Sequence, residues 1–244
     1  MNKLKTGIKG LDRLMNGGIP KGHSVLISGQ TGAGKTVLGL QYLINGAEKE
    51  KERGMFLSFE ESKDDLIRQG ETFGWDIAGL EKKGMIKICE FSPTKEHLKS
   101  IEDKISEDVE KFKPDRLVFD SISTYGVYAE TLSAFEAMMD LGKTEGNPLI
   151  SPDSALRRAV MSIMGKIKTF TTTALIISEL PEMSNYLSRD TVSEFLSDGV
   201  ILLKHAPIGD SLNRSMEVRK MRQSAMLEGP RSYNITKKGI IVEV

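Results

Sequence analysis

The sequence predicts an α/β fold with a mainly parallel central sheet, flanked by helices and completed by antiparallel strands near the C-terminus. Continuous apolar runs alternate with helical patterns up to about residue 180, as in a parallel sheet that is covered on both faces. A glycine-rich turn joins the first of these runs directly to a helix. Beyond residue 199, short strand patterns follow one another without helices, which favours antiparallel pairing.

Composition narrows the class of protein. We interpret the 244 residues as one domain, residues 1–244, because α/β folds of this size often form a single unit. Hydrophobic residues at 39% and charged residues at 28% are typical of a soluble globular protein. No stretch is long enough to cross a membrane, and no apolar segment of a secretory signal follows Met1-Asn2-Lys3-Leu4-Lys5. We therefore expect a cytoplasmic protein without a membrane partner.

Net charge leaves nucleic-acid binding open, whereas the cysteine content excludes a disulfide-stabilised fold. The formal net charge is zero, so nucleic-acid binding would require a local basic patch. Cys89 is the only cysteine, which rules out an intramolecular disulfide, and its apolar neighbours indicate a buried small side chain.

The strand predictions rest on short apolar runs bounded by turn residues. A turn-rich region rich in glycine, residues 6–20, precedes the first of them. The predicted strands cover residues 24–28, 54–59, 85–90, 116–120, 173–178, 200–203, 215–221, 233–235 and 240–242.

The helix predictions rest on apolar residues at helical spacing. The predicted helices cover residues 36–49, about 63–73, a stretch after Ser92-Pro93 that carries Leu98, Ile101, Ile105 and Val109, and then residues 129–141 and 156–169. Residues 142–148 are interpreted as a loop, as are residues 121–128 and the polar segment 179–194.

The glycine-rich turn has the spacing of a phosphate-binding loop, G-x-x-x-x-G-K-[ST]. It follows a strand pattern and opens a helix, which is the context that this motif requires. Backbone N–H groups of such a loop and the N-terminus of the helix together bind anionic phosphates. The candidate cofactor-binding residues are Gly29, Gln30, Thr31, Gly32, Ala33, Gly34, Lys35, Thr36 and Val37. We expect Lys35 to reach the β- and γ-phosphates and Thr36 to offer its hydroxyl to Mg²⁺.

Three carboxylates follow predicted strands and are candidates for chemistry. Asp120 closes an apolar strand, so it should lie at the carboxyl edge of the sheet and support the Mg²⁺; a simple turn cap beside Ser121 is the alternative. Glu60 and Glu61 end another strand at the same edge, and Glu60 is the first candidate to activate water in line with the γ-phosphate. The alternative places this pair in the first turn of the next helix, where negative charge is favoured.

Two cations on a late strand permit two interpretations. Strand periodicity places Lys220 and Arg222 on one face, with Arg219 on the other. They could belong to a solvated edge strand. Alternatively, they could stabilise phosphate charge in a neighbouring subunit, as an arginine finger does. The sequence pattern alone leaves both open.

The ordered motifs resemble the KaiC-type ATPases of the RecA superfamily, in the single-domain form common in archaea. The resemblance covers nearly the whole chain. Its motifs are Thr6-Gly7-Ile8, Gly10-Leu11-Asp12, Gly17-Gly18-Ile19-Pro20, the phosphate loop, Phe59-Glu60-Glu61-Ser62, Phe73-Gly74-Trp75-Asp76, the strand end at Asp120, Glu194-Phe195-Leu196-Ser197-Asp198, Lys220-Met221-Arg222 and Ile235-Thr236 with Gly239-Ile240.

The resemblance implies a RecA-like P-loop fold, ATP and Mg²⁺ as cofactors, and Glu60 and Glu61 as catalytic residues. It also implies a homo-oligomer, a hexameric ring or a filament, with nucleotide between subunits and with Lys220 and Arg222 acting on the neighbour's γ-phosphate. The positions that match Thr72, Ser224 and Thr236 lie near nucleotide in the clock protein of the family. Gln223 and Met226 depart from the Gly and His that the family commonly has, which puts base and ribose contacts there in doubt.

Three functions remain as hypotheses. The first is a slow, oligomeric, Mg²⁺-dependent ATPase that uses nucleotide state as a switch. The second is a recombinase paralog that acts in DNA repair on single-stranded DNA or with a RecA-type recombinase. Segments 121–128 and 179–194 would be its DNA face; Arg189 is their only basic residue, and Tyr125, Tyr128 and Tyr186 could stack on bases. The third is an ATP-binding signalling module with negligible turnover. We expect no circadian autokinase, because only one copy of the domain is present.

Overall fold

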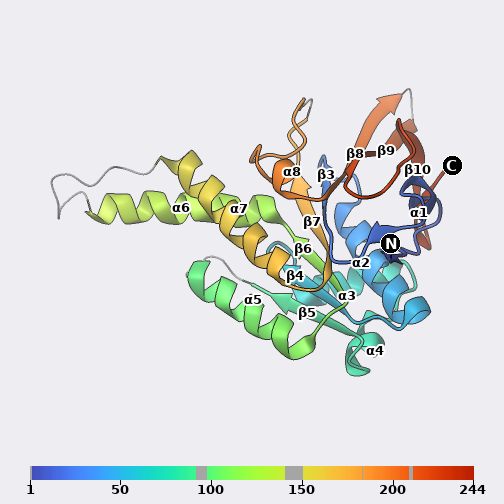
Figure 1. The fold of residues 1–244 in the computed structure, drawn as a ribbon, viewed down its shortest axis with the longest axis horizontal. Helices are drawn as coiled ribbons and strands as arrows, with labels where there is room; N and C mark the ends of the chain where they lie inside the picture. Colours follow the sequence, from blue (N-terminus) through green and yellow to red (C-terminus); the bar gives the residue numbers. More distant parts are fainter. Residues whose placement is uncertain (1, 92–97, 141–150, 183, 209–210) are drawn as a thin grey trace.

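A nine-stranded sheet forms the centre of the computed structural model, which describes residues 2–91, 98–140, 151–182, 184–208 and 211–244 (Figure 1). Its strand order is β11-β10-β9-β8-β3-β7-β6-β4-β5. The strands are β3 (Ser24–Gly29), β4 (Gly54–Ser58), β5 (Ile86–Glu90), β6 (Arg116–Asp120), β7 (Thr173–Glu179), β8 (Gly199–Ile208), β9 (Ser211–Met221), β10 (Arg231–Thr236) and β11 (Gly239–Val242). The two short strands β1 (Lys3–Leu4) and β2 (Ile19–Pro20) pair separately.

The pairing confirms the predicted fold class. The strands from β8 across to β5 are all parallel, and β9, β10 and β11 are added in antiparallel fashion at one side. Parallel neighbours place all their carboxyl ends at one edge of the sheet, here called the carboxyl edge, which is where open α/β sheets bind ligands.

Helices cover both faces of the sheet. They are α1 (Leu11–Leu14), α2 (Lys35–Asn45), α3 (Lys63–Thr72), α4 (Ile77–Lys82), α5 (Leu98–Phe112), α6 (Ile122–Asp140), α7 (Pro152–Thr169) and α8 (Ser193–Leu196), with a π-helical turn η1 (Gly46–Glu50) after α2. Consecutive residues of a strand pack against helices on opposite faces of the sheet, since side chains alternate along a strand. Val25 and Ile27 join the apolar cluster under α2, α3 and α4, whereas Leu26 joins the cluster under α5, α6 and α7.

One predicted boundary, the start of the helix after β6, is wrong by seven residues. Helix α6 begins at Ile122 and not at Ala129, so most of the segment 121–128 is helical. Ile122 and Tyr125 are fully buried, and the Tyr125 ring packs edge-on against Phe59 at 5.6 Å between centroids. Serine, threonine and glycine around these residues resemble a turn, and tertiary burial overrides that local preference.

Other boundaries shift less. Helix α7 begins at Pro152, four residues before the predicted start, with Ser151 as its N-cap. Strands β8 and β9 extend well beyond the predicted 200–203 and 215–221, because they pair with each other along ten positions. The predicted loop 142–148 lies outside the described residues. Among the described helices, none is long and apolar enough to cross a membrane.

Candidate functional site

The phosphate loop connects the end of β3 to the start of α2 at the carboxyl edge. Gly34 caps the helix in the left-handed region, with φ of +88°, and no side chain caps the first N–H groups. These N–H groups lack partners within the helix, so they can bind an anion at the loop. Gly29 must be glycine for a different reason: a Cβ there would lie 2.5 Å from the carbonyl oxygen of Leu203.

Lys35 is buried at the base of the loop and contacts a carboxylate that the sequence analysis missed. Its side chain is 7% exposed; Nζ donates to the Gln30 carbonyl at 3.0 Å and forms an ion pair with Glu179 Oε1 at 3.3 Å. Glu179 ends β7, the strand beside β3. Like Asp120, it is an acidic residue that closes an apolar strand, and this pattern could have identified it.

Thr36 and Asp120 form the pair of oxygens expected for a metal. The Thr36 hydroxyl donates to Asp120 Oδ2 at 2.7 Å. Burial raises the pKa of Asp120 to about 7, against the lowering effect of the Thr36 hydrogen bond. A hydroxyl and a carboxylate are hard oxygen ligands of the kind that Mg²⁺ prefers, and a cation would offset the charge of this buried carboxylate. These residues therefore fit the ion.

Glu60 and Glu61 lie in the connection between β4 and α3. Strand β4 ends at Ser58 and α3 begins at Lys63, so neither strand alternation nor the first helical turn fixes their directions. Glu60 Oε1 accepts hydrogen bonds from the hydroxyls of Ser121 and Thr124, just beyond the end of β6. Glu61 is half-buried, and its pKa is raised by burial first and then by the charges of Asp65 and Glu60.

These acidic groups form one cluster. The charges of Glu60 and Glu61 raise the pKa of Asp120, and the charge of Lys35 lowers it. In addition, the backbone N–H of Phe59 donates to the Asp120 carbonyl at 2.7 Å, which ties the two strand ends together. The structure thus brings Lys35, Thr36, Asp120 and the glutamate pair to the same part of the carboxyl edge.

Lys220 and Arg222 lie at the opposite edge of the sheet. Lys220 Nζ donates to the carbonyls of Glu194 and Ser197, at 2.9 and 2.6 Å. Arg222 follows the end of β9 and pairs with Asp198 at 3.2 Å. The pKa of Lys220 is lowered by burial first and then by the charge of Arg222.

The strand register shows how far these cations are from the phosphate loop. Asp198 hydrogen-bonds Ser24, the first residue of β3, whereas the loop begins at Gly29. Five residues of strand span about 16 Å. The structure therefore does not bring Lys220 and Arg222 to the phosphate loop of the same chain.

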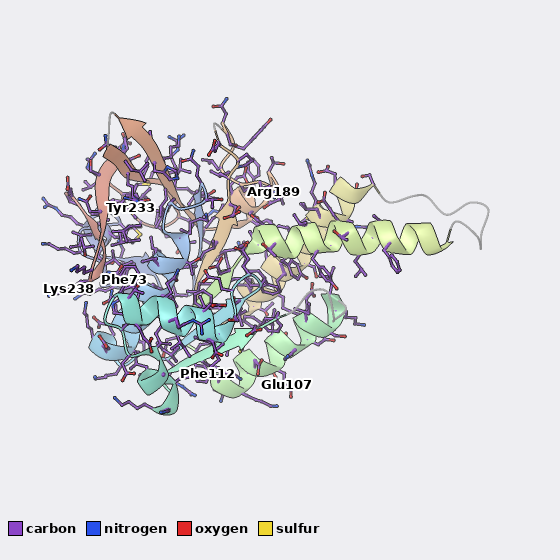
Figure 2. All side chains as sticks on the ribbon, turned by 180° about the vertical axis from the view of Figure 1, so that it is seen from behind. Phe73, Glu107, Phe112, Arg189, Tyr233 and Lys238 are labelled. Carbon is purple, nitrogen blue, oxygen red and sulfur yellow. The ribbon has the colours of Figure 1, made fainter. Side chains whose placement is uncertain are left out.

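The three remaining candidate residues lie in different places. Ser224 lies at the edge of Lys220 and Arg222, where its hydroxyl accepts from Lys3 Nζ at 2.7 Å. Thr236 ends β10, the strand that packs on the phosphate loop through the Tyr233 hydroxyl, which donates to the Ala33 carbonyl at 2.6 Å (Figure 2). Thr72 ends α3, and its hydroxyl donates to the Gln69 carbonyl at 2.7 Å.

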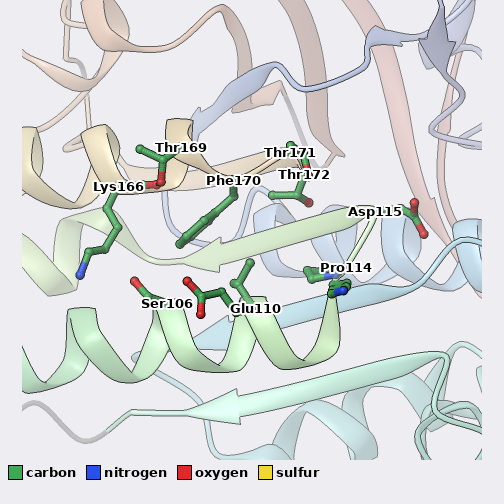
Figure 3. Close-up of a pocket in the computed structure, with 11 residues that line it drawn as sticks. Ser106, Glu110, Pro114, Asp115, Lys166, Thr169, Phe170, Thr171 and Thr172 are labelled. Atoms are coloured by element: carbon green, nitrogen blue, oxygen red, sulfur yellow. The ribbon is translucent and has the colours of Figure 1, made fainter.

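A separate cavity of about 570 Å³ lies between α5 and α7 (Figure 3). Its lining includes Phe170, Thr172, Lys166 and Glu110. None of the candidate residues from the sequence lines it, so it is distinct from the phosphate-loop site.

The sheet order, together with the phosphate loop at the carboxyl edge, defines a P-loop protein with a KaiC/RecA-like fold. A family model described as "ATPase: KaiC" matches residues 4–144 and 146–244, and the chain belongs to this family. A solved KaiC-like protein of the hyperthermophilic archaeon Pyrococcus horikoshii OT3 superposes with a TM-score of 0.82. It is 30% identical, and the match covers 100% of this chain and 99% of that one.

Curated relatives include the circadian clock oscillator protein KaiC of two organisms. The protein of Synechococcus elongatus is 29% identical over 98% of this chain and 43% of its own length. That of Prochlorococcus marinus subsp. pastoris is 30% identical over 99% of this chain and 45% of its own length. The chain thus spans less than half the length of these curated relatives.

Proposed function

We propose that this protein binds ATP with Mg²⁺ and slowly hydrolyses it at a site completed by a second subunit, as one domain over residues 1–244. The observation that supports this most is the division of the candidate residues between two edges. The phosphate loop, Asp120 and the glutamate pair gather at the carboxyl edge, and Lys220 and Arg222 lie at the other.

Within one subunit, each group has a defined role. The loop N–H groups and Lys35 would bind the phosphates, and Thr36 and Asp120 would hold the ion. Mg²⁺, when bound, neutralises phosphate charge. Glu60, oriented by the hydroxyls of Ser121 and Thr124, would accept a proton from the attacking water, and the adjacent Glu61 is the second candidate for this role.

The opposite placement of the cations suggests how subunits associate. If Lys220 and Arg222 act on phosphate, they must act on that of a neighbour, and the contact is then head-to-tail. Such contacts close into rings or continue as filaments. We favour a hexameric ring or a filament whose nucleotide state switches its assembly or a partner.

A mixing experiment tests the shared site. Glu60→Gln and Arg222→Ala subunits should each be nearly inactive, whereas mixed assemblies should recover part of the wild-type ATP turnover, because some interfaces combine an intact Glu60 with an intact Arg222. Subunit exchange is verified with two differently tagged proteins. Absence of recovery after verified exchange contradicts the shared site.

The two alternative functions are distinguished by further measurements. For DNA binding, one of the three candidate tyrosines is lost because Tyr125 is fully buried. The half-buried Tyr128 and Tyr186, which is 65% exposed, remain as stacking candidates. Salt-dependent binding to single-stranded DNA would favour the recombinase paralog. Bound ATP without phosphate release would favour the signalling module.

A further inference from the structure

The carboxylate of Glu179, at the end of β7, contacts phosphate-loop groups that the phosphates of a nucleotide would need. Its Oε1 lies 3.3 Å from Lys35 Nζ and 3.5 Å from the Thr31 hydroxyl. Both of those groups belong to the loop and would otherwise be available to phosphate oxygens. One carboxylate oxygen of Glu179 therefore satisfies two phosphate-binding groups.

Burial explains why Lys35 needs this partner. An ammonium group that is 7% exposed is costly unless a counter-charge and hydrogen bonds compensate it. Among the described residues, Glu179 is the one carboxylate in ion-pair distance of Lys35; the carbonyl of Gln30 supplies the other contact.

The backbone of Glu179 is held by hydrogen bonds, whereas its side chain is partly exposed to solvent. The Glu179 N–H donates to the Ser123 hydroxyl at 2.9 Å, and the N–H of Leu180 donates to the Gly29 carbonyl at 3.0 Å. The Glu179 side chain, by contrast, is 38% exposed and contacts only loop groups in its described hydrogen bonds. It can thus leave Lys35 without disturbing β7.

An adjacent cavity offers a place for the released carboxylate. It has a volume of about 410 Å³ and is lined by Thr31 and Glu179 together with Glu182 and Arg189. Arg189 belongs to the segment that follows β7, on the carboxyl side of the strand (Figure 2). Its guanidinium would compensate a carboxylate that turns away from Lys35.

We propose that Glu179 is a positioning residue: it holds Lys35 through their ion pair and is displaced by the phosphates of the nucleotide, so that it weakens nucleotide binding. This inference rests on the proposed function, since it assumes that the loop binds ATP. Its effect is larger for ATP than for ADP, because the γ-phosphate adds negative charge near Lys35.

The test compares Glu179→Gln with the wild type and with Glu182→Gln. Glutamine keeps the shape and the acceptor oxygen of Glu179 but removes its charge. Glu182→Gln removes the same charge from the same cavity without a contact to Lys35. Dissociation constants for ATP and ADP are measured by titration calorimetry at fixed Mg²⁺ and salt, and midpoints of urea unfolding are measured without nucleotide.

The expected result is ATP binding at least three-fold tighter in Glu179→Gln, a smaller gain for ADP, and a lower unfolding midpoint without nucleotide. Glu182→Gln should match the wild type in both dissociation constants and in the unfolding midpoint. Unchanged or weaker ATP binding by Glu179→Gln, in a wild type that does bind ATP, overturns the inference alone. A wild type that binds neither nucleotide overturns the proposed function and the inference with it.

Discussion

The Thr36 hydroxyl donates a 2.7 Å hydrogen bond to Asp120 Oδ2. This contact joins the first turn of α2 to the carboxyl end of β6, two elements that are 84 positions apart in the sequence. Asp120 is only 4% exposed. Its carboxylate therefore accepts a short hydrogen bond but is largely removed from water, which disfavours its charged form.

Asp120→Asn should therefore change the pH dependence of stability. Burial raises the pKa of Asp120 from 3.8 to about 7, so the folded state binds the proton more tightly than the unfolded chain. The favourable contribution of the Asp120 carboxyl to the free energy of unfolding is present below pH 4 and is lost as the pH rises toward 7. We expect Asp120→Asn to raise the free energy of unfolding by on the order of 1–4 kcal/mol at pH 8 and by less at pH 5.

Urea unfolding with EDTA at pH 5, 6.5 and 8 measures this difference. The exposed Asp64→Asn is the control and should show no comparable gain. A gain from Asp120→Asn that is equal at all three pH values would contradict the raised pKa.

Glu60→Gln should separate binding from turnover. The amide can still accept from the hydroxyls of Ser121 and Thr124, but it cannot take a proton from water. We expect turnover to fall by about 10²–10⁴ with the dissociation constant for ATP nearly unchanged. The exposed Glu71→Gln on α3 should retain wild-type turnover. Full activity of Glu60→Gln would exclude Glu60 as the base.

Gly29→Ala should destabilise the protein through a backbone collision. The new Cβ would lie 2.5 Å from the Leu203 carbonyl, and neither backbone can yield easily inside the sheet. We expect a loss of about 1–3 kcal/mol in the free energy of unfolding. Gly165→Ala in α7 has open space around it and should gain about 0.5–1 kcal/mol. Equal effects of the two substitutions would argue against this steric account.

Arg116→Ala should be among the more damaging substitutions far from the phosphate loop. The side chain is fully buried, pairs with Glu52 and donates to the carbonyls of Tyr42 and Lys5 at 2.8 Å. Its removal leaves a largely buried carboxylate and two carbonyls without partners, at a cost of about 3–5 kcal/mol. Arg157→Ala, whose ion pair is exposed, should change stability by less than about 1 kcal/mol. Denaturant unfolding at neutral pH distinguishes the two.

Local sequence patterns determined the fold class and much of the carboxyl edge. Apolar runs such as Arg116–Asp120 form strands because burial on both faces requires it, and the loop motif needs only its strand and helix to be recognised. Since parallel strands share one carboxyl edge, the positions of Asp120 and Glu60 beside the loop followed from their strand ends alone. The family likewise follows from ordered motifs along the chain.

Only the tertiary structure decided what depends on contacts between distant segments. The burial of Tyr125 extends α6 over a stretch whose local composition resembles a turn. The ion pair of Lys35 with Glu179 arises because β7 lies beside β3, and no spacing in the chain encodes that neighbourhood. The antiparallel return of β9 carries Lys220 and Arg222 to the edge opposite the phosphate loop, since strand direction, and not residue type, sets which edge a side chain reaches.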